Sequence, residues 1–242
     1  MSDADAPTGR VGVVIVAGGS GSRLGAAEPK AFVRVAGRTL LSYAVERVAQ
    51  VPGLASLVMV APATHLDAAR ADLIPLASAD LVAVGARSAD AAVVAGGAER
   101  SDSVRIGLER LDPACDLIVI HDAARCLTPV AVFERVIAAV RGGAAGAVPG
   151  LPVVDTIKVV DGDGVITGTP DRATLWAVQT PQGFDATVLR TAYASGLTAT
   201  DDAALVEAIG HHVRVVEGDP LAFKITTPDD LARAELLVRA LP

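Results

Sequence analysis

One stretch decides the fold of this 242-residue chain: Val11-Gly-Val-Val-Ile-Val-Ala-Gly-Gly-Ser-Gly-Ser-Arg-Leu-Gly25. Its first six residues are a continuous and mostly β-branched run, which is typical of a strand that helices cover on both faces. The residues that follow form a glycine-rich loop. A buried strand that ends in such a loop predicts an α/β sheet whose functional residues lie in loops at the carboxyl ends of the strands.

Strand and helix patterns alternate along the chain beyond this stretch. Helical spacing of apolar residues is found at 39–49, 66–76, 101–111, 129–140, 187–194, 202–209 and 229–238. Short apolar runs predict strands at 57–60, 81–84, 92–94, 117–120, 144–148, 213–216 and 222–225. This order predicts a single domain over residues 1–242, with a doubly wound and mostly parallel sheet.

A protruding β-hairpin arm is predicted at about 150–175. Two β-like pieces, Val153–Val160 and Val165–Thr169, flank Asp161-Gly-Asp-Gly164, which is a strong turn signal. An isolated hairpin is marginal in water, and this one has more apolar side chains than a solvated ribbon should show. Exchange of arms in a twofold dimer would cover them, so we expect a homodimer.

Composition excludes several classes of protein. The formal net charge is −7, so the chain has no excess of basic groups for a nucleic-acid partner. No stretch of about 20 apolar residues is uninterrupted, and the first residues lack the pattern of a secretory signal. Cys115 and Cys126 have no metal-ligand partner at useful spacing. We therefore expect a cytoplasmic protein with reduced thiols and no membrane partner.

The glycine loop, with Arg23 and Lys30, is suited to anionic oxygens. Glycines allow backbone N–H groups to approach phosphates closely, and the two side chains add positive charge. A Walker A loop is excluded because no Gly-Lys-Ser/Thr tripeptide occurs. A dinucleotide loop is disfavoured because the second strand ends in Val60-Ala-Pro62 rather than in an acidic residue. A phosphate cradle is favoured, with a simple turn as the bland alternative.

Three further loops carry polar clusters. In Gly96-Gly-Ala-Glu-Arg-Ser-Asp-Ser-Val104, Ser101 or Asp102 could cap the next helix, or the loop could recognise the edge of a base. In His121-Asp-Ala-Ala-Arg125, Asp122 could hold Mg²⁺ or a ribose hydroxyl and Arg125 a phosphate, or the two could form an internal ion pair. Lys224 interrupts an apolar run, so it either reaches solvent or meets an anion.

Six ordered motifs make the chain resemble the 2-C-methyl-D-erythritol 4-phosphate cytidylyltransferases of the non-mevalonate isoprenoid pathway. They are Ala17-Gly-Gly-x-Gly-x-Arg23-x4-Glu-Pro-Lys30, Glu99-Arg-x-Asp-Ser-Val104, His121-Asp-Ala-Ala-Arg125, Gln179-Thr-Pro-Gln-x-Phe184, Thr200-Asp-Asp-Ala203 and Lys224-Ile-Thr-Thr-Pro-x-Asp-Leu231. The resemblance implies a Rossmann-like fold of the nucleotide-diphospho-sugar transferase type, and a reaction of CTP with a polyol phosphate that releases pyrophosphate.

The resemblance also implies roles for individual residues. The CTP site would consist of Ala17, Gly18, Gly19, Gly97, Ser103 and Asp122. Arg23 and Lys30 would stabilise charge on the reacting phosphate, and Asp122 would bind Mg²⁺ or another divalent cation. Methylerythritol phosphate would be held by Arg125, Thr180, Thr200 and Lys224. Arg172, with Thr156 beside it on the arm, would reach the partner subunit's site in a homodimer with exchanged arms.

Three other functions stay open on the residues alone. A ribitol 5-phosphate cytidylyltransferase shares nearly all of these motifs, and a sugar-1-phosphate nucleotidyltransferase shares mainly the first. The third is a catalytically idle nucleotide-binding regulator, which the intact cations and Asp122 disfavour. The attacking phosphate is already largely ionised at neutral pH, so the reaction requires no general base. This agrees with the absence of a Ser-His-Asp or Cys-His motif.

Overall fold

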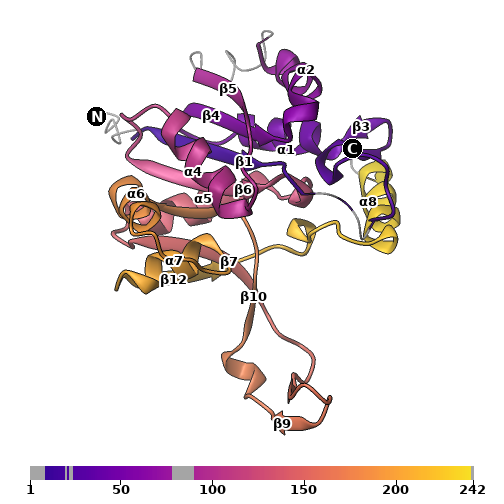
Figure 1. Cartoon of the computed structure of the whole chain (residues 1–242), viewed down its shortest axis with the longest axis vertical. Coiled ribbons are helices and arrows are strands. Elements are labelled where there is room, and N and C mark those ends of the chain that lie inside the picture. The colour runs from indigo at the N-terminus through magenta and orange to yellow at the C-terminus, as the bar shows by residue number, and fades with distance from the viewer. Residues whose placement is uncertain (1–8, 20, 22–23, 78–89, 241–242) are drawn as a thin grey trace, which may run out of the picture.

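A computed structural model of the chain describes residues 9–19, 21, 24–77 and 90–240, with only the backbone at 74–77 (Figure 1). The strand expected at 81–84 and the predicted catalytic Arg23 lie outside these residues. Within them, the alternating order of strands and helices matches the expected α/β architecture.

The centre of the described structure is an eight-stranded sheet, and it is mostly parallel, as predicted. β1 pairs in parallel with β4 and β6, β4 with β5, and β12 with β7, whereas β10 and β11 run antiparallel to their neighbours. The strands are β1 (Val11–Val16), β4 (Leu54–Ala61), β5 (Asp90–Ala95), β6 (Leu117–Asp122), β7 (Gly146–Pro152), β10 (Trp176–Val178), β11 (Gln182–Asp185) and β12 (Val213–Glu217).

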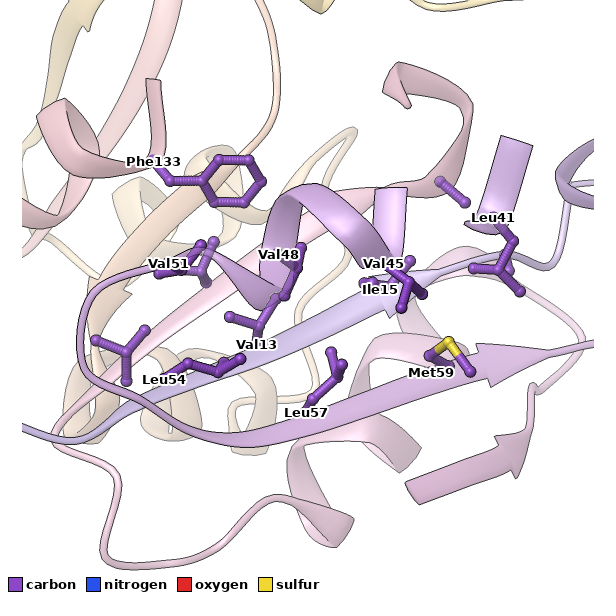
Figure 2. Close-up of a cluster of buried hydrophobic side chains, with 14 of the residues drawn as sticks. Val13, Ile15, Leu41, Val45, Val48, Val51, Leu54, Leu57, Met59 and Phe133 are labelled. Atoms are coloured by element: carbon purple, nitrogen blue, oxygen red, sulfur yellow. The ribbon is translucent and has the colours of Figure 1, made fainter. Parts of the chain in front are cut away.

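Helices cover both faces of the sheet because successive strand residues point to opposite sides. Val13 and Ile15 of β1 pack into a cluster with one set of helices (Figure 2), whereas Val14 packs into a second cluster on the other face. The first set is α1 (Leu40–Ala49), α2 (Leu66–Ala77) and α5 (Val130–Arg141). The second is α4 (Arg100–Arg110), α6 (Ala186–Ala194) and α7 (Asp202–Ala208).

The last helix, α8 (Pro228–Ala240), packs beside α1. A third cluster joins Ala234 of α8 to Leu40 and Ala44 of α1 and to Val35 of a small hairpin. That hairpin is formed by β2 (Arg34–Val35) and β3 (Arg38–Thr39), and the sequence patterns did not predict it. Five 3₁₀ helices complete the described elements: η2 (Lys30–Phe32), η3 (Ala63–His65), η4 (Ala123–Arg125), η5 (Arg172–Thr174) and η6 (Pro220–Ala222).

The predicted arm projects from the body of the molecule (Figure 1). β8 (Val159–Val160) and β9 (Ile166–Gly168) pair antiparallel, and the Asp161 carboxylate accepts hydrogen bonds from the Val165 and Asp163 amides across the expected turn. Strand structure is confined to Val159–Val160 rather than spanning the expected Val153–Val160. Apolar side chains on the arm are largely exposed, with Val154 at 79%.

The strand predicted at 222–225 is wrong. The chain instead forms η6, whose first position is Pro220 and whose N-cap Asp219 accepts a hydrogen bond from the Leu221 amide. Proline is favoured at the first helical position and aspartate at the N-cap, so local preference overrides the apolar pattern. Residues 223–225 then run outside the sheet, with the Ile225 amide donating to the Ala124 carbonyl.

Two further features concern the described helices and the two cysteines. None of the helices that the structure describes has both the length and the apolar character needed to cross a membrane. Cys115 and Cys126 are both buried free thiols.

Core packing gives a first prediction. Leu41 is fully buried in the cluster of Figure 2, so Leu41→Ala should lower the free energy of unfolding by about 2–5 kcal/mol. Leu236 is 72% exposed, and the same replacement there should change stability by less than about 0.5 kcal/mol. Urea unfolding of both variants measures the difference, and equal losses would contradict this assignment of the core.

Candidate active site

A cavity of about 300 Å³ lies where the first strand and its neighbours end. It receives residues from the loop after β1, from η2, from the loop between β5 and α4, from the end of β6 and from the segment after η6. The polar and glycine residues that line it are Gly18, Gly19, Gly21, Lys30, Gly97, Glu99, Arg100, Ser103, Asp122, Lys224 and Thr226. Four of the six sequence motifs therefore meet in one place.

The glycine loop and Lys30 form one wall. The Lys30 amide donates to the Gly19 carbonyl at 3.0 Å, which folds η2 back against the loop. Gly21 adopts a φ of 73°, a conformation that favours glycine. The Lys30 side chain is buried, and its Nζ donates to Thr226 Oγ1 at 3.3 Å. A cation is thus fixed beside backbone groups, as the phosphate-cradle interpretation requires.

The second loop is compact because of Gly97. A Cβ at this position would lie 2.4 Å from Asp102 Cβ, so a side chain does not fit. The Gly97 amide donates to Ser103 Oγ at 3.2 Å, and this hydroxyl donates to the Glu99 carbonyl. The expectation that Ser101 or Asp102 caps the next helix is wrong. Glu99 is the N-cap of α4, and the Asp102 carboxylate accepts a hydrogen bond from the Glu99 amide.

Asp122 is the centre of charge in the cavity. Its Oδ2 accepts from Lys224 Nζ at 2.7 Å, its Oδ1 lies 3.4 Å from Arg100 Nη2, and its amide donates to Thr180 Oγ1. Burial alone would raise the pKa of this carboxyl. The positive charges of Arg100 and Lys224 more than offset that effect and lower the pKa to about 2. Asp122 is therefore ionised at neutral pH.

Arg125 bonds backbone carbonyls rather than the Asp122 carboxylate. Its guanidinium donates to the carbonyls of Ala222 at 2.7 Å and Val178 at 3.4 Å. It thereby joins the segment that precedes Lys224 to the strand at the root of the arm. Arg125 and Thr180 do not line the described cavity itself, although Thr180 contacts Asp122 directly.

Three predicted substrate residues do not line the described cavity. Thr156 and Arg172 are exposed on the arm, where Arg172 Nη1 donates to the Val154 carbonyl. Thr200 is exposed just before α7. Within one chain these three residues therefore contribute nothing to the lining of the cavity.

Arg100 is a cavity residue to which the sequence patterns assign no role. It is the first residue of α4, and its guanidinium bridges Asp122 and the fully buried Asp202. Burial alone would lower the pKa of Arg100, but the Asp202 carboxylate raises it overall. The acidic pair Asp201-Asp202 was the available signal, since a carboxylate in an apolar helix pattern needs a cation.

No group of three or more His, Cys, Asp or Glu side chains that could hold a metal ion exists in the described part of the chain. Asp122 and Glu99 are the carboxylates that line the cavity. One or two carboxylates, completed by water and substrate phosphates, are the usual protein ligands of Mg²⁺. The donor set therefore fits a cation that arrives with a phosphorylated substrate.

Known proteins resemble this chain over nearly all of its length. The family model for 2-C-methyl-D-erythritol 4-phosphate cytidylyltransferase matches residues 11–240. The protein of that name from Nocardia farcinica is 49% identical over 238 residues, which cover 98% of this chain and 97% of the relative.

Solved structures agree with the sequence relatives. The crystal structure of 2-C-methyl-D-erythritol 4-phosphate cytidylyltransferase from Thermus thermophilus has a TM-score of 0.73 and 35% identity, covering 95% of this chain and 99% of that one. The structure of 4-diphosphocytidyl-2C-methyl-D-erythritol synthase from Anaerococcus prevotii has a TM-score of 0.79 and 27% identity, with coverages of 96% and 99%.

The buried histidine beside the cavity gives a second prediction. Burial lowers the pKa of His121 from 6.5 to about 4, so the unfolded chain binds a proton here at a higher pH than the folded chain. Stability should therefore fall as the pH drops from about 7 to about 4.5, by roughly 2–3 kcal/mol through this group. Urea titrations of His121→Asn should show a smaller loss than wild type.

Exposed His212 provides the control, since His212→Asn should keep the wild-type pH dependence of unfolding. An undiminished loss of stability in His121→Asn would contradict a neutral, buried imidazole.

Proposed function

Because this chain belongs to the 2-C-methyl-D-erythritol 4-phosphate cytidylyltransferase family, we propose that its cavity is where CTP reacts with 2-C-methyl-D-erythritol 4-phosphate. The products are 4-diphosphocytidyl-2-C-methyl-D-erythritol and pyrophosphate. The observation that carries this placement is the meeting of Lys30, Lys224 and Arg100 with Asp122 around a glycine loop. Two phosphorylated substrates need such a concentration of positive charge.

The nucleotide is assigned to the side of the cavity formed by the first two loops. Ala17, Gly18 and Gly19 offer backbone groups to the phosphates, and Gly97 and Ser103 lie at the start of α4. Gly97 and Ser103 both line the cavity, which supports placing the base of the nucleotide beside them. Asp122 borders the same space, within reach of a ribose or of a metal ion.

The reaction is an in-line displacement at phosphorus. An oxygen of the polyol phosphate bonds to the α-phosphorus of CTP, and the bond from that phosphorus to the bridging oxygen of the β-phosphate breaks. Its electron pair leaves with pyrophosphate. The second pKa of a phosphate monoester is about 6, so the attacking oxygen is ionised without a base. The work of the protein is positioning and charge stabilisation.

Lys30 is assigned to the reacting α-phosphate and Lys224 to the polyol phosphate. Arg23, outside the described residues, is proposed to act with Lys30. Lys30 is buried at the glycine loop, where a fixed cation costs no reorganisation as negative charge develops. Lys224 is 43% exposed and is bonded to Asp122. It therefore has room to move toward an incoming anion.

A divalent cation, Mg²⁺ first, is proposed to bind at Asp122. The ionised and buried carboxylate is a hard oxygen donor, which supports this assignment. Such a cation would neutralise charge on the nucleotide phosphates. The protein's own contribution is to hold Asp122 by hydrogen bonds on its carboxylate and on its amide.

We also propose a homodimer in which each arm completes the neighbouring site. Exposed apolar side chains on the arm support this, because water alone is a poor partner for Val154, Val165 and Ile166. Arg172 and Thr156 need no rearrangement within the chain if the partner subunit's cavity receives them. A cytoplasmic location is proposed as well, supported by the two unpaired thiols.

The function is tested by pyrophosphate release with purified protein. CTP with 2-C-methyl-D-erythritol 4-phosphate should react much faster than UTP with the same acceptor, because a site that bonds the exocyclic amine of cytosine rejects a base that lacks it. Ribitol 5-phosphate is the parallel acceptor. Faster turnover with ribitol 5-phosphate would favour the alternative cytidylyltransferase, and equal use of UTP would favour a sugar-1-phosphate nucleotidyltransferase.

The shared site is tested by mixing variants. Lys30→Ala should lower kcat by about 10²–10³, because it removes a charge that acts in the transition state. Arg172→Ala should also be impaired. In exchanged heterodimers one site keeps both residues, so an equal mixture should recover up to about a quarter of wild-type activity.

Lys158→Ala is the matched control on the same arm, since Lys158 bonds only Thr169 among the described contacts. It should be active alone, and its equal mixture with Lys30→Ala should show no more than the average activity of the two parent proteins. Absence of recovery after demonstrated subunit exchange would refute the shared site but not the reaction.

A further inference from the structure

Arg100 holds two carboxylates at once, and the two contacts differ in strength. Nη1 and Nη2 donate to the two oxygens of Asp202 at 3.1 and 2.7 Å, a bidentate arrangement. Nε and Nη2 both lie 3.4 Å from Oδ1 of Asp122. The guanidinium is therefore anchored on Asp202 and presents its remaining edge to Asp122.

Asp202 is itself held rigidly. Its side chain is fully buried, and the Tyr193 hydroxyl donates to its Oδ1. The start of α7 around it is fixed by the side chain of Gln182 in β11. Its Nε2 donates to the Asp201 carboxylate, and its Oε1 accepts from the backbone amide of Ala203. The anchor of Arg100 thus rests on the sheet and not on a surface loop.

The anchored guanidinium affects the orientation of the Asp122 carboxylate. Lys224 bonds Oδ2 and Arg100 faces Oδ1, so the two cations divide the carboxylate between them. Lys224 is carried by a segment outside the sheet and is assigned to a substrate phosphate. When it moves to that phosphate, Arg100 is the remaining described cation bonded to the carboxylate.

We propose that Arg100 is a positioning residue: it fixes the orientation of Asp122 during the reaction, and Asp202 with Tyr193 fixes Arg100. The inference rests on the proposed function, because it concerns the same cavity. It adds a chain of contacts, from Asp202 through Arg100 to Asp122, that links α7, α4 and β6 behind the site. A misplacement of about 1 Å in a reacting group can cost about 10² in rate, so the effect should be measurable.

A single Arg100→Met variant would be a poor test. It would leave the buried Asp202 carboxylate without its cation, and an unpaired buried charge is strongly destabilising. The double variant Arg100→Met with Asp202→Asn avoids this, because it removes both charges and leaves an amide that can still accept from Tyr193. It separates the neutralisation of Asp202 from the positioning of Asp122.

The experiment measures kcat, the KM for CTP and urea unfolding of this double variant. We expect a folded protein with near wild-type stability, a kcat lowered by about 10², and a KM for CTP that changes much less. A folded double variant with wild-type kcat would overturn the proposal, since Arg100 would then serve only to neutralise Asp202.

Two further variants complete the test. Arg105→Met removes a cation from the same helix, where it pairs with Asp102 and not with Asp122, and should keep wild-type kcat. Arg100→Lys keeps a charge for Asp202 but loses the planar fork that spans both carboxylates, so a folded protein with reduced kcat is expected. This variant decides the matter if the double variant does not fold, and an unchanged kcat would overturn the proposal.

The failure of the inference differs from the failure of the proposed function. If wild type and Arg105→Met release no pyrophosphate from CTP and 2-C-methyl-D-erythritol 4-phosphate, the function is wrong. If both are active and the Arg100 variants are equally active, only the positioning role is wrong.

Discussion

The register of four parallel strands is the constraint on which the site depends. Val16 of β1 lies opposite Asp122 of β6, and on its other side β1 pairs with β4, which pairs with β5 up to Ala61 and Ala95. The glycine loop, the Asp122 loop and the Gly97 loop therefore start at the same edge of the sheet. A slip by one residue would turn Asp122 to the opposite face and separate it from Lys224.

Ion pairs in this cavity offset the cost of burying charged groups. Asp122 is costly to desolvate, and the nearby positive charges, chiefly Arg100 and Lys224, keep its carboxyl ionised. The Asp122 carboxylate, which contacts both Arg100 and Lys224, offsets the repulsion between these two cations. In the proposed function, an anionic substrate would draw Lys224 away from Asp122, while the Arg100–Asp202 pair would remain in place behind it. The Lys224–Asp122 pair would then be the adaptable ion pair of the site, and the Arg100–Asp202 pair the fixed one.

Much of the fold could be predicted from local patterns, because a short stretch of sequence is enough to specify a buried strand such as β1 or a capped helix such as α1. Lys30, Gly97 and Asp122 were predicted for the site because they lie in loops that follow buried strands, whereas Ser103 was assigned only through the resemblance. β10 and β11 were missed since they are only three and four residues long, too short for a periodic pattern. Arg100 was missed because its partner Asp202 is 102 residues away: the acidic pair Asp201-Asp202 indicates that a cation is needed, but not which one.

The segment that carries Lys224 lies outside the sheet, and this ties the site to the end of the chain. Residues 223–227 are held by the Ile225 amide on Ala124 and by the Asp230 carboxylate, which accepts from the amides of Thr226 and Thr227 at the start of α8. Fraying of the first turn of α8 would release Thr226, and with it the contact to Lys30, while every strand stayed paired. Local unfolding of a terminal helix is thus coupled to the cations of the cavity without any opening of the core.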